Sequence, residues 1–105
     1  MASWLPGILA RIRKLAKEGR VRLTVKAIAE LRGLGLGLDV SDAIDILTTL
    51  STADSAGRLR SSASSEWLYV FKPMAAETAL YVKIVLRGDC VVVSFHKDDA
   101  DEEGS

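Results

Sequence analysis

The spacing of apolar residues changes once along this 105-residue chain, close to Ser51. Before that point apolar residues recur every three or four positions, as they do on one face of a helix. After it, apolar and polar residues alternate, as they do along strands that expose one face to solvent. Helices followed by antiparallel strands are typical of an α+β domain. The sequence therefore predicts N-terminal helices packed on an antiparallel β-sheet.

Each of the three helical segments carries its own start or stop signal. The first predicted helix begins near Pro6 and ends before Gly19, the usual positions of proline and glycine at helix ends. The side chain of Thr24 can cap a second helix, and Asp39 or Ser41 can cap a third. We therefore expect three helices in the first half of the chain.

The second half of the chain contains the clearest strand signals. Residues 67–72 are rich in aromatic and β-branched side chains, which favour a strand. Residues 80–87 and 90–96 alternate more clearly, and the Gly88-Asp89 pair between them suits a type II′ hairpin turn. The short alternating segment 21–23 predicts a brief edge strand. This order of strand signals predicts a meander of antiparallel strands.

A two-residue turn fixes the register of the last two strands. With Gly88-Asp89 as the turn, Arg87 pairs with Cys90, and Tyr81 lies opposite His96. Because side chains alternate between the two faces, one face is then entirely apolar. We expect that face in the core, and its residues are Leu80, Val82, Ile84, Leu86, Val91, Val93 and Phe95. A slip of one residue would bring charges into the core, which favours this register.

The opposite face of this hairpin carries side chains suited to acid–base chemistry on a phosphate. Histidine exchanges protons at physiological pH, so His96 is a candidate acid or base, and Tyr81 offers a hydroxyl or a stacking surface. Cations that could hold a phosphate there are Lys83, Arg87, Arg58, Arg60 and Lys72. Metal-independent RNA cleavage requires a base, an acid and cations of this kind. The alternative interpretation is an ordinary exposed sheet face with mixed polar residues.

The charges of the chain are unevenly distributed. The 14 Lys+Arg balance the 14 Asp+Glu, but five of the acids lie in residues 98–105, which we expect to be a disordered acidic tail. Residues 1–97 are predicted to form a single domain, with 14 bases, 9 acids and a net charge of +5. This charge is compatible with a nucleic-acid partner.

The composition also excludes several classes of protein. A single Cys cannot form an internal disulfide, and with one His there are too few soft ligands for a zinc site. We therefore expect no metal, no other cofactor and a reducing, cytoplasmic location. No apolar run approaches the roughly 18 residues that span a bilayer, so we expect no membrane partner.

The chain resembles the MqsR family of bacterial toxins, which belongs to the wider RelE-like ribonuclease fold. Four segments carry the resemblance, and they are Gly19-Arg20-Val21-Arg22 with Thr24, Leu36-Gly37-Leu38-Asp39, Trp67 with Val70-Phe71-Lys72-Pro73, and Leu80-Tyr81-Val82-Lys83-Ile84 with Asp89 and Val92-Val93-Ser94-Phe95. The resemblance implies a RelE-like toxin domain over residues 1–97. It also implies the toxin of a type II toxin–antitoxin system, an endoribonuclease (mRNA interferase) that cuts mRNA, inhibits translation and is held inactive by a cognate antitoxin.

The resemblance also assigns candidate site residues. Tyr81 matches an active-site tyrosine of the family, and His96 stands where a well-known member has a catalytic lysine. Leu68 stands where that member has a glutamine that contributes to the site. The family's other site lysine lies before the first long strand, where Arg58 is the first candidate and Arg60 the second.

Three functions follow from these residues. The first is an mRNA interferase in which His96 is the general acid or base, while Tyr81 positions the scissile nucleotide or shares the proton transfer. The second is a degenerate toxin that only binds its antitoxin, which Leu68 and the missing lysine would favour. The third is an RNA-binding module without catalysis, whose affinity comes from phosphate contacts.

Overall fold

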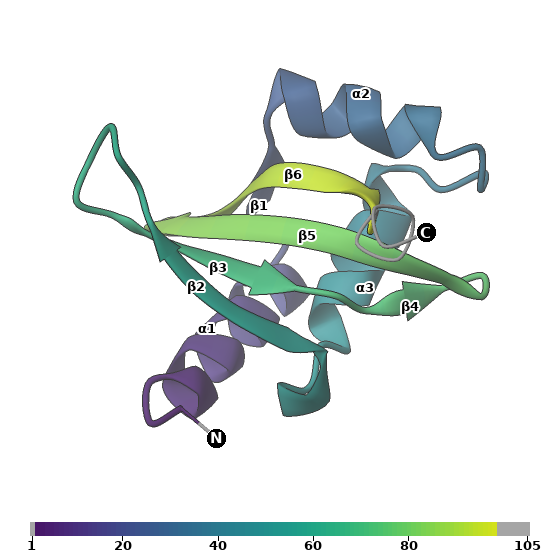
Figure 1. The fold of residues 1–105 in the computed structure, drawn as a ribbon. Coiled ribbons are helices and arrows are strands. Elements are labelled where there is room, and N and C mark those ends of the chain that lie inside the picture. The colour runs from purple at the N-terminus through teal and green to yellow at the C-terminus, as the bar shows by residue number, and fades with distance from the viewer. Residues whose placement is uncertain (1, 99–105) are drawn as a thin grey trace, which may run out of the picture.

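The computed structural model describes residues 2–98, so all of the predicted 98–105 tail except Asp98 lies outside the described part. Within residues 2–98, helices pack on one β-sheet and confirm the α+β class (Figure 1). In chain order the elements are α1 (Leu5–Lys17), β1 (Val21–Leu23), α2 (Val25–Gly33), α3 (Val40–Thr48), the 3-10 turn η1 (Thr52–Asp54), β2 (Ser55–Arg60), β3 (Trp67–Phe71), β4 (Met74–Ala75), β5 (Thr78–Arg87) and β6 (Asp89–Lys97).

The sheet is mixed rather than purely antiparallel. Its strand order is β1-β6-β5-β3-β2, with β4 paired to β5 outside this path. The predicted edge strand β1 is present, but it runs parallel to β6, with Val21 beside Cys90 and Leu23 beside Val92. No short hairpin joins β1 to β6, so nothing in the connection imposes the antiparallel direction.

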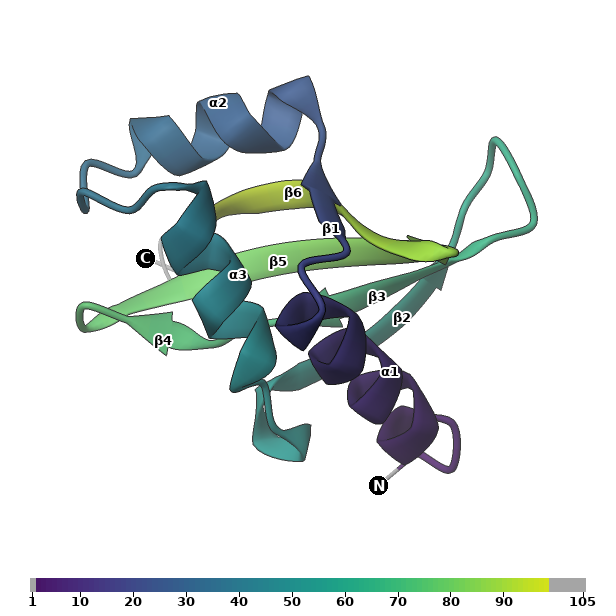
Figure 2. The same cartoon turned by 180° about the vertical axis from the view of Figure 1, so that it is seen from behind.

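Two helices cover one face of the sheet. Figure 2 shows α1 and α3 lying across that face, while α2 lies beside β6. The apolar stripe of α1 is buried at Leu9, Ile12 and Leu15, and each such side chain stabilises the fold by about 1.5–3 kcal/mol. The guanidinium of Arg13 donates to the backbone oxygen of Leu50, 3.1 Å away, and so ties α1 to the end of α3. None of the helices within residues 2–98 is long and apolar enough to cross a membrane.

The predicted helix caps are confirmed. The Thr24 hydroxyl accepts a hydrogen bond from the backbone N–H of Ala27 at 3.1 Å. Asp39, rather than Ser41, caps α3, because its carboxylate and that of Asp42 each accept the other's backbone N–H at 2.9 Å. Each cap satisfies an N–H group that lacks a partner in the first turn of its helix.

The β5–β6 hairpin differs from its predicted register near the turn. Tyr81 faces His96 and Lys83 faces Ser94, as predicted. Closer to the turn, Arg87 faces Asp89 instead of Cys90, so Gly88 alone lies between the paired residues. Gly88 has a φ of +84°, which glycine adopts readily. A register shift between Lys83 and Ile84 joins the two halves of the ladder, and Val93 is the extra residue of this β-bulge.

The bulge changes which side chains of β6 enter the core. Leu80, Val82, Ile84 and Phe95 are fully buried, as predicted. In β6, however, Cys90 and Val92 belong to the core cluster, in place of the predicted Val91 and Val93. Because a shift of one residue moves a side chain to the other face, the turn-proximal half of β6 is reversed relative to the prediction.

Cys90 is a structural residue. Its side chain is fully buried, and desolvation raises the pKa of the thiol to about 12. The thiolate is therefore scarce at neutral pH, and the thiol is a poor nucleophile there.

Candidate active site

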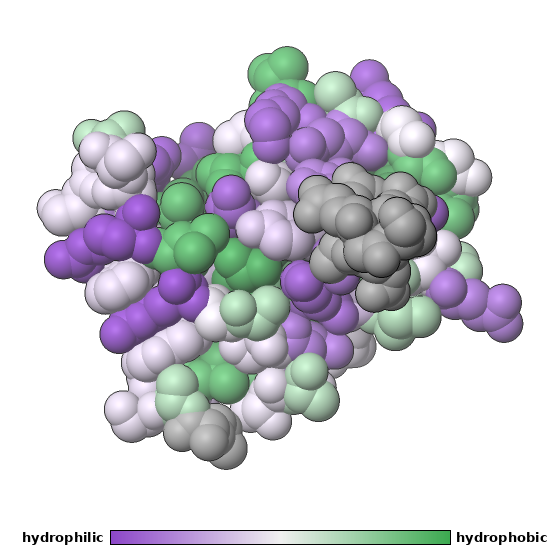
Figure 3. All heavy atoms as spheres, viewed as in Figure 1, coloured by the Kyte–Doolittle hydropathy of each residue, from purple (hydrophilic) through white to green (hydrophobic). Residues whose placement is uncertain are grey.

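The sheet face opposite α1 and α3 holds the candidate site, and we call it the open face. Strands β3, β5 and β6 and the residue that follows β3 contribute Leu68, Val70, Lys72, Tyr81, Lys83, Val85, Arg87, Val91, Ser94 and His96. Figure 3 views the molecule from this side, where hydrophilic side chains cover much of the surface and hydrophobic ones show between them. Val70, Val85 and Val91 are buried there, so the polar groups lie around a small apolar patch.

Tyr81 and His96 form a stacked pair at one end of the open face. They are direct cross-strand neighbours on β5 and β6. Their ring centroids are 5.0 Å apart and the ring planes differ by 10°. Both residues are half-buried, and one face of each ring packs against the other ring.

One ring nitrogen of His96 is already engaged. Nδ1 lies 2.7 Å from the backbone oxygen of Lys97. A carbonyl oxygen can only accept, so Nδ1 carries a proton in this arrangement, and the neutral ring has its basic lone pair on Nε2. The ring is therefore oriented with Nε2 as the nitrogen for proton transfer.

Two lysines lie near the stacked pair, Lys83 on β5 and Lys26 on α2. The Lys83 ammonium lies 5.7 Å from the centroid of the Tyr81 ring. Ser94 lies opposite Lys83, and its buried hydroxyl is 3.1 Å from the ammonium of Lys26, which extends from α2. Lys26 was not among the predicted site residues.

Glu30, one turn after Lys26 on α2, is a second residue that the sequence did not predict. Its Oε1 accepts the backbone N–H of Phe95 at 3.0 Å, and its Oε2 forms an ion pair with Lys26 at 3.1 Å. Partial burial alone would raise the pKa of this carboxyl. The hydrogen bonds from Phe95 and Lys26, with the charges of Lys26 and His96, outweigh burial and lower the pKa below its ordinary value. Glu30 therefore carries a negative charge close to the candidate base.

Lys72 follows β3 on the open face. Phe71 pairs with Val82, which places Lys72 next to Tyr81 across the β3–β5 ladder. Its ammonium lies 3.4 Å from the carboxylate of Asp98. Asp98 in turn donates its backbone N–H to the oxygen of Ala79, at 2.9 Å.

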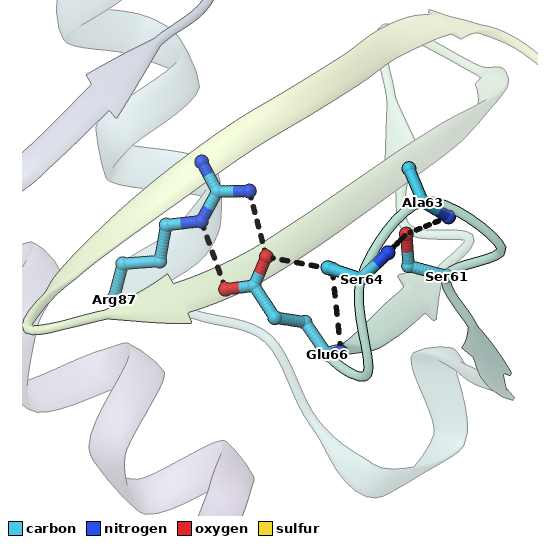
Figure 4. A network of polar contacts seen from close by, with 5 residues as sticks. All are labelled: Ser61, Ala63, Ser64, Glu66 and Arg87. Carbon is cyan, nitrogen blue, oxygen red and sulfur yellow. Dashed lines mark hydrogen bonds and ion pairs between the residues drawn. The ribbon is translucent and has the colours of Figure 1, made fainter.

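Arg87 shares the open face but lies far from the stacked pair. It is six positions along β5 from Tyr81, a distance of about 20 Å. Its guanidinium makes two hydrogen bonds to the Glu66 carboxylate, at 2.9 and 2.8 Å (Figure 4). The Arg87 hydrogen bond lowers the pKa of Glu66, and the Ser64 hydroxyl, 3.1 Å away, adds to this effect. The structure therefore does not bring Arg87 to the predicted phosphate site.

Arg58 and Arg60 were expected beside the stacked pair, and the structure places them on the other face of the sheet. The Arg58 guanidinium carbon lies 3.8 Å from the ring centroid of Trp67 and 4.8 Å from that of Trp4. The Arg60 guanidinium carbon is 4.5 Å from the Trp67 centroid. Alternation along β2 explains the difference, because Leu59 is the residue that shares the open face with its cross-strand neighbour.

An open pocket of about 680 Å³ adjoins His96. It lies between the C-terminal end of α2 and the outer ends of β5 and β6. Glu30, Leu34 and Leu36 line one side, and Thr78 and His96 line the other. Lys97 also lines the pocket, which therefore begins at the candidate base and has a basic residue in its wall.

Comparisons with known proteins agree with the resemblance. The model of a family described as "Motility quorum-sensing regulator, toxin of MqsA" matches residues 7–97. The protein described as "mRNA interferase toxin MqsR" of Escherichia coli (strain K12) is 31% identical over 88 residues, which cover 83% of this chain and 88% of that protein. The open-face residues described above all lie within the span that the family model matches.

Proposed function

The chain belongs to the motility quorum-sensing regulator (MqsR) family of toxins, and from this premise we propose that it cleaves mRNA with the stacked Tyr81–His96 pair. The toxin acts in a type II toxin–antitoxin system and inhibits translation. Its partners are single-stranded mRNA and a cognate antitoxin, and its location is the cytoplasm. The observation that carries the proposal is the 5.0 Å ring stack on a face with three nearby lysines.

The reaction needs one proton to leave and one to arrive. The ribose 2′-oxygen attacks the adjacent phosphorus, and the bond from phosphorus to the 5′-oxygen breaks. The products are a 2′,3′-cyclic phosphate and a free 5′-hydroxyl. A base must take the 2′-hydroxyl proton, an acid must protonate the leaving oxygen, and cations must stabilise the charge on the phosphate.

His96 and Tyr81 supply the two proton transfers in this proposal. Nε2 of His96 takes the 2′-hydroxyl proton, because Nδ1 is engaged with the Lys97 carbonyl. The imidazolium that forms is stabilised by the face of the Tyr81 ring stacked on it. The Tyr81 hydroxyl, on the same face of the sheet, is the donor for the leaving 5′-oxygen.

Lysines carry the electrostatic part of the mechanism. The ammonium of Lys83 lies 5.7 Å from the centroid of the Tyr81 ring. Lys26 and Lys72 lie on either side of the pair, from α2 and from the end of β3. These three replace the predicted combination of Lys83, Arg87 and Arg58. In the proposed mechanism these ammonium groups stabilise the charge that develops on the phosphate.

The test is RNA cleavage by the purified His96→Ala variant. We expect at least a 100-fold slower rate, on the order of what a general base contributes. Arg11→Ala, on the exposed side of α1, is the matched control and should cleave at the wild-type rate. His96→Ala that cleaves as fast as wild type would overturn the role of His96. The 5′ ends of the products should carry hydroxyls.

A binding module without catalysis is the second candidate function. It is favoured by Leu68, an apolar residue on the open face, and by the placement of Arg58 on the other face. Expression in cells that lack the antitoxin separates the two functions, because only a ribonuclease should arrest growth in a way that Tyr81→Ala abolishes. Absence of growth arrest, together with intact RNA after incubation with pure protein, would favour the module.

A further inference from the structure

We propose that the end of the open face around Lys72 is a docking surface for this chain's own acidic C-terminal segment, residues 99–105, which binds there in place of RNA phosphates. Docking itself requires no RNA, whereas competition with RNA rests on the proposed function. The match to the family model ends at residue 97, so the segment lies beyond the part of the chain that the family relationship explains.

The first acid of the acidic run already lies on the open face. Alternate residues share a face of a strand, which places Asp98 on the same side as His96. The backbone N–H of Asp98 donates to the oxygen of Ala79 at 2.9 Å, so the pairing with β5 continues to this residue. Its carboxylate lies 3.4 Å from the Lys72 ammonium, and only 16% of the side chain is exposed. The chain therefore leaves the sheet with one carboxylate already paired on the open face.

The charge of the segment is opposite to that of the surface beside it. Residues 99–105 read Asp-Ala-Asp-Glu-Glu-Gly-Ser, with four acids and no base, whereas residues 1–97 carry a net charge of +5. The ammonium groups near the stacked pair are those of Lys72, Lys83 and Lys26. Carboxylates and phosphates are both oxyanions that accept charge-assisted hydrogen bonds from such groups. The segment thus offers the lysines the same chemistry as an RNA backbone.

The segment is long enough to reach the lysines. An extended chain spans roughly 3.3–3.6 Å per residue, so residues 99–105 reach up to about 25 Å. Along β5, Ala79 is two positions from Tyr81 and four from Lys83, which corresponds to about 7 and 13 Å. Because β6 leads away from the stacked pair, the segment has to turn back after Asp98. Its length allows this turn.

Attachment to the sheet makes weak contacts effective. An exposed ion pair is weak by itself and is screened by salt. A short connection, however, gives a tethered group an effective concentration on the order of millimolar at its site. The ion pair of Asp98 with Lys72 sets the starting point of that connection on the open face. RNA then has to displace the segment, which lowers the apparent affinity for RNA without abolishing it.

A nitroxide spin label at Ser105→Cys tests docking without RNA. Cys90, the one native cysteine, is fully buried and its thiol has a pKa raised to about 12, so the label reacts at residue 105. We expect the backbone amide signals of Tyr81 and Lys83 to broaden more than that of Arg11, on the helix that covers the other face of the sheet (Figure 2). The difference should shrink as salt is raised from about 0.01 M to about 0.3 M.

Two matched double variants test competition with RNA. Asp101→Asn with Glu102→Gln removes two charges from the segment, and Asp45→Asn with Glu18→Gln removes two from exposed positions on α3 and α1. At about 0.1 M salt the screening length is about 10 Å, so only nearby charges matter. The segment variant should bind single-stranded RNA about threefold more tightly than wild type, in line with the loss of weak ion pairs. The helix variant should bind like wild type.

The outcomes separate docking from the proposed function. If wild type neither binds nor cleaves RNA, the proposed function fails, and the spin label still decides whether the segment docks. Equal broadening on the two faces, or none on the open face, would overturn docking and leave the ribonuclease standing. Docking with equal RNA affinities for the two double variants would overturn the competition. Broadening confined to the open face, together with tighter RNA binding by the segment variant alone, supports the proposal.

Discussion

The rings of Tyr81 and His96 lie parallel on neighbouring strands, with 10° between their planes and 5.0 Å between their centroids. This separation is within the range of favourable aromatic pairs. Pairing through the β5–β6 ladder brings the two rings together, so the stack is held by backbone hydrogen bonds as well as by ring contact. Because the ring of Tyr81 makes the stack and its hydroxyl is the proposed proton donor, mutation can test the two contributions separately.

The first prediction concerns these two parts of Tyr81. Tyr81→Phe keeps the ring against His96 and removes only the hydroxyl, so we expect about 100-fold slower cleavage with unchanged RNA affinity. Tyr81→Ala should lose the ring as well and be slower still. Cleavage rates and equilibrium binding of the same RNA measure the difference. Tyr81→Phe at the wild-type rate would show that the hydroxyl is not the proton donor.

The second prediction contrasts two cations of the open face. Lys83 lies next to the stacked pair, whereas Arg87 is held by Glu66 near the turn. Lys83→Ala should weaken RNA binding and reduce the slope of log affinity against log salt by about 1, as expected for one lost phosphate contact. Arg87→Ala should leave that slope unchanged. Equal slopes for the two variants would contradict the assignment.

The Tyr81–His96 pairing could be predicted from the sequence because the far half of the hairpin alternates strictly. The turn-proximal half could not, since Cys90 through Val93 are all apolar and fit either face. Only the bulge at Val93 decides which of them enter the core, and a bulge carries no distinct signal in a run of valines. A prediction from the pattern alone therefore assigns the side chains in this half of β6 to the wrong faces of the sheet.

The site residues that the sequence missed are explained by tertiary contacts. Past Val92, no strand within residues 2–98 pairs with the outer edge of β6, and Lys26 and Glu30 of α2 bond to Val93, Ser94 and Phe95 instead. Their spacing of four residues, on the flank of α2 next to its buried Ala27 and Leu31, was a visible signal of a shared role. Which strand they would meet depends on the packing of α2.

The third prediction concerns the guanidinium of Arg58, which lies between the rings of Trp4 and Trp67. Cation–π contacts of this kind contribute about 0.5–2 kcal/mol. Arg58→Ala should therefore lower the free energy of unfolding by about 1 kcal/mol and the melting temperature by roughly 4–8 °C. Cleavage by the folded variant should equal that of wild type. A large loss of cleavage with unchanged stability would instead return Arg58 to the active site.

The fourth prediction is a pH dependence of stability that originates at Glu30. Its pKa lies below the ordinary value of 4.5 in the folded protein, because the hydrogen bonds from Phe95 and Lys26 outweigh the effect of burial. A carboxyl with a lowered folded-state pKa stabilises the fold at pH values above its unfolded-state pKa. That contribution decreases as the pH falls below 4.5 and is gone once the pH has passed through the folded-state value.

Glu30→Gln cannot ionise, so its stability should lack this part of the pH dependence. Urea unfolding of wild type and Glu30→Gln at pH 7 and at steps below 4.5 measures the effect. The stability difference between the two proteins should be largest at pH 7 and shrink steadily toward acid. Glu18→Gln is the matched control, and its difference from wild type should stay constant over the same range. A constant difference for Glu30→Gln would mean that the carboxylate charge contributes nothing to holding α2 against the edge of β6.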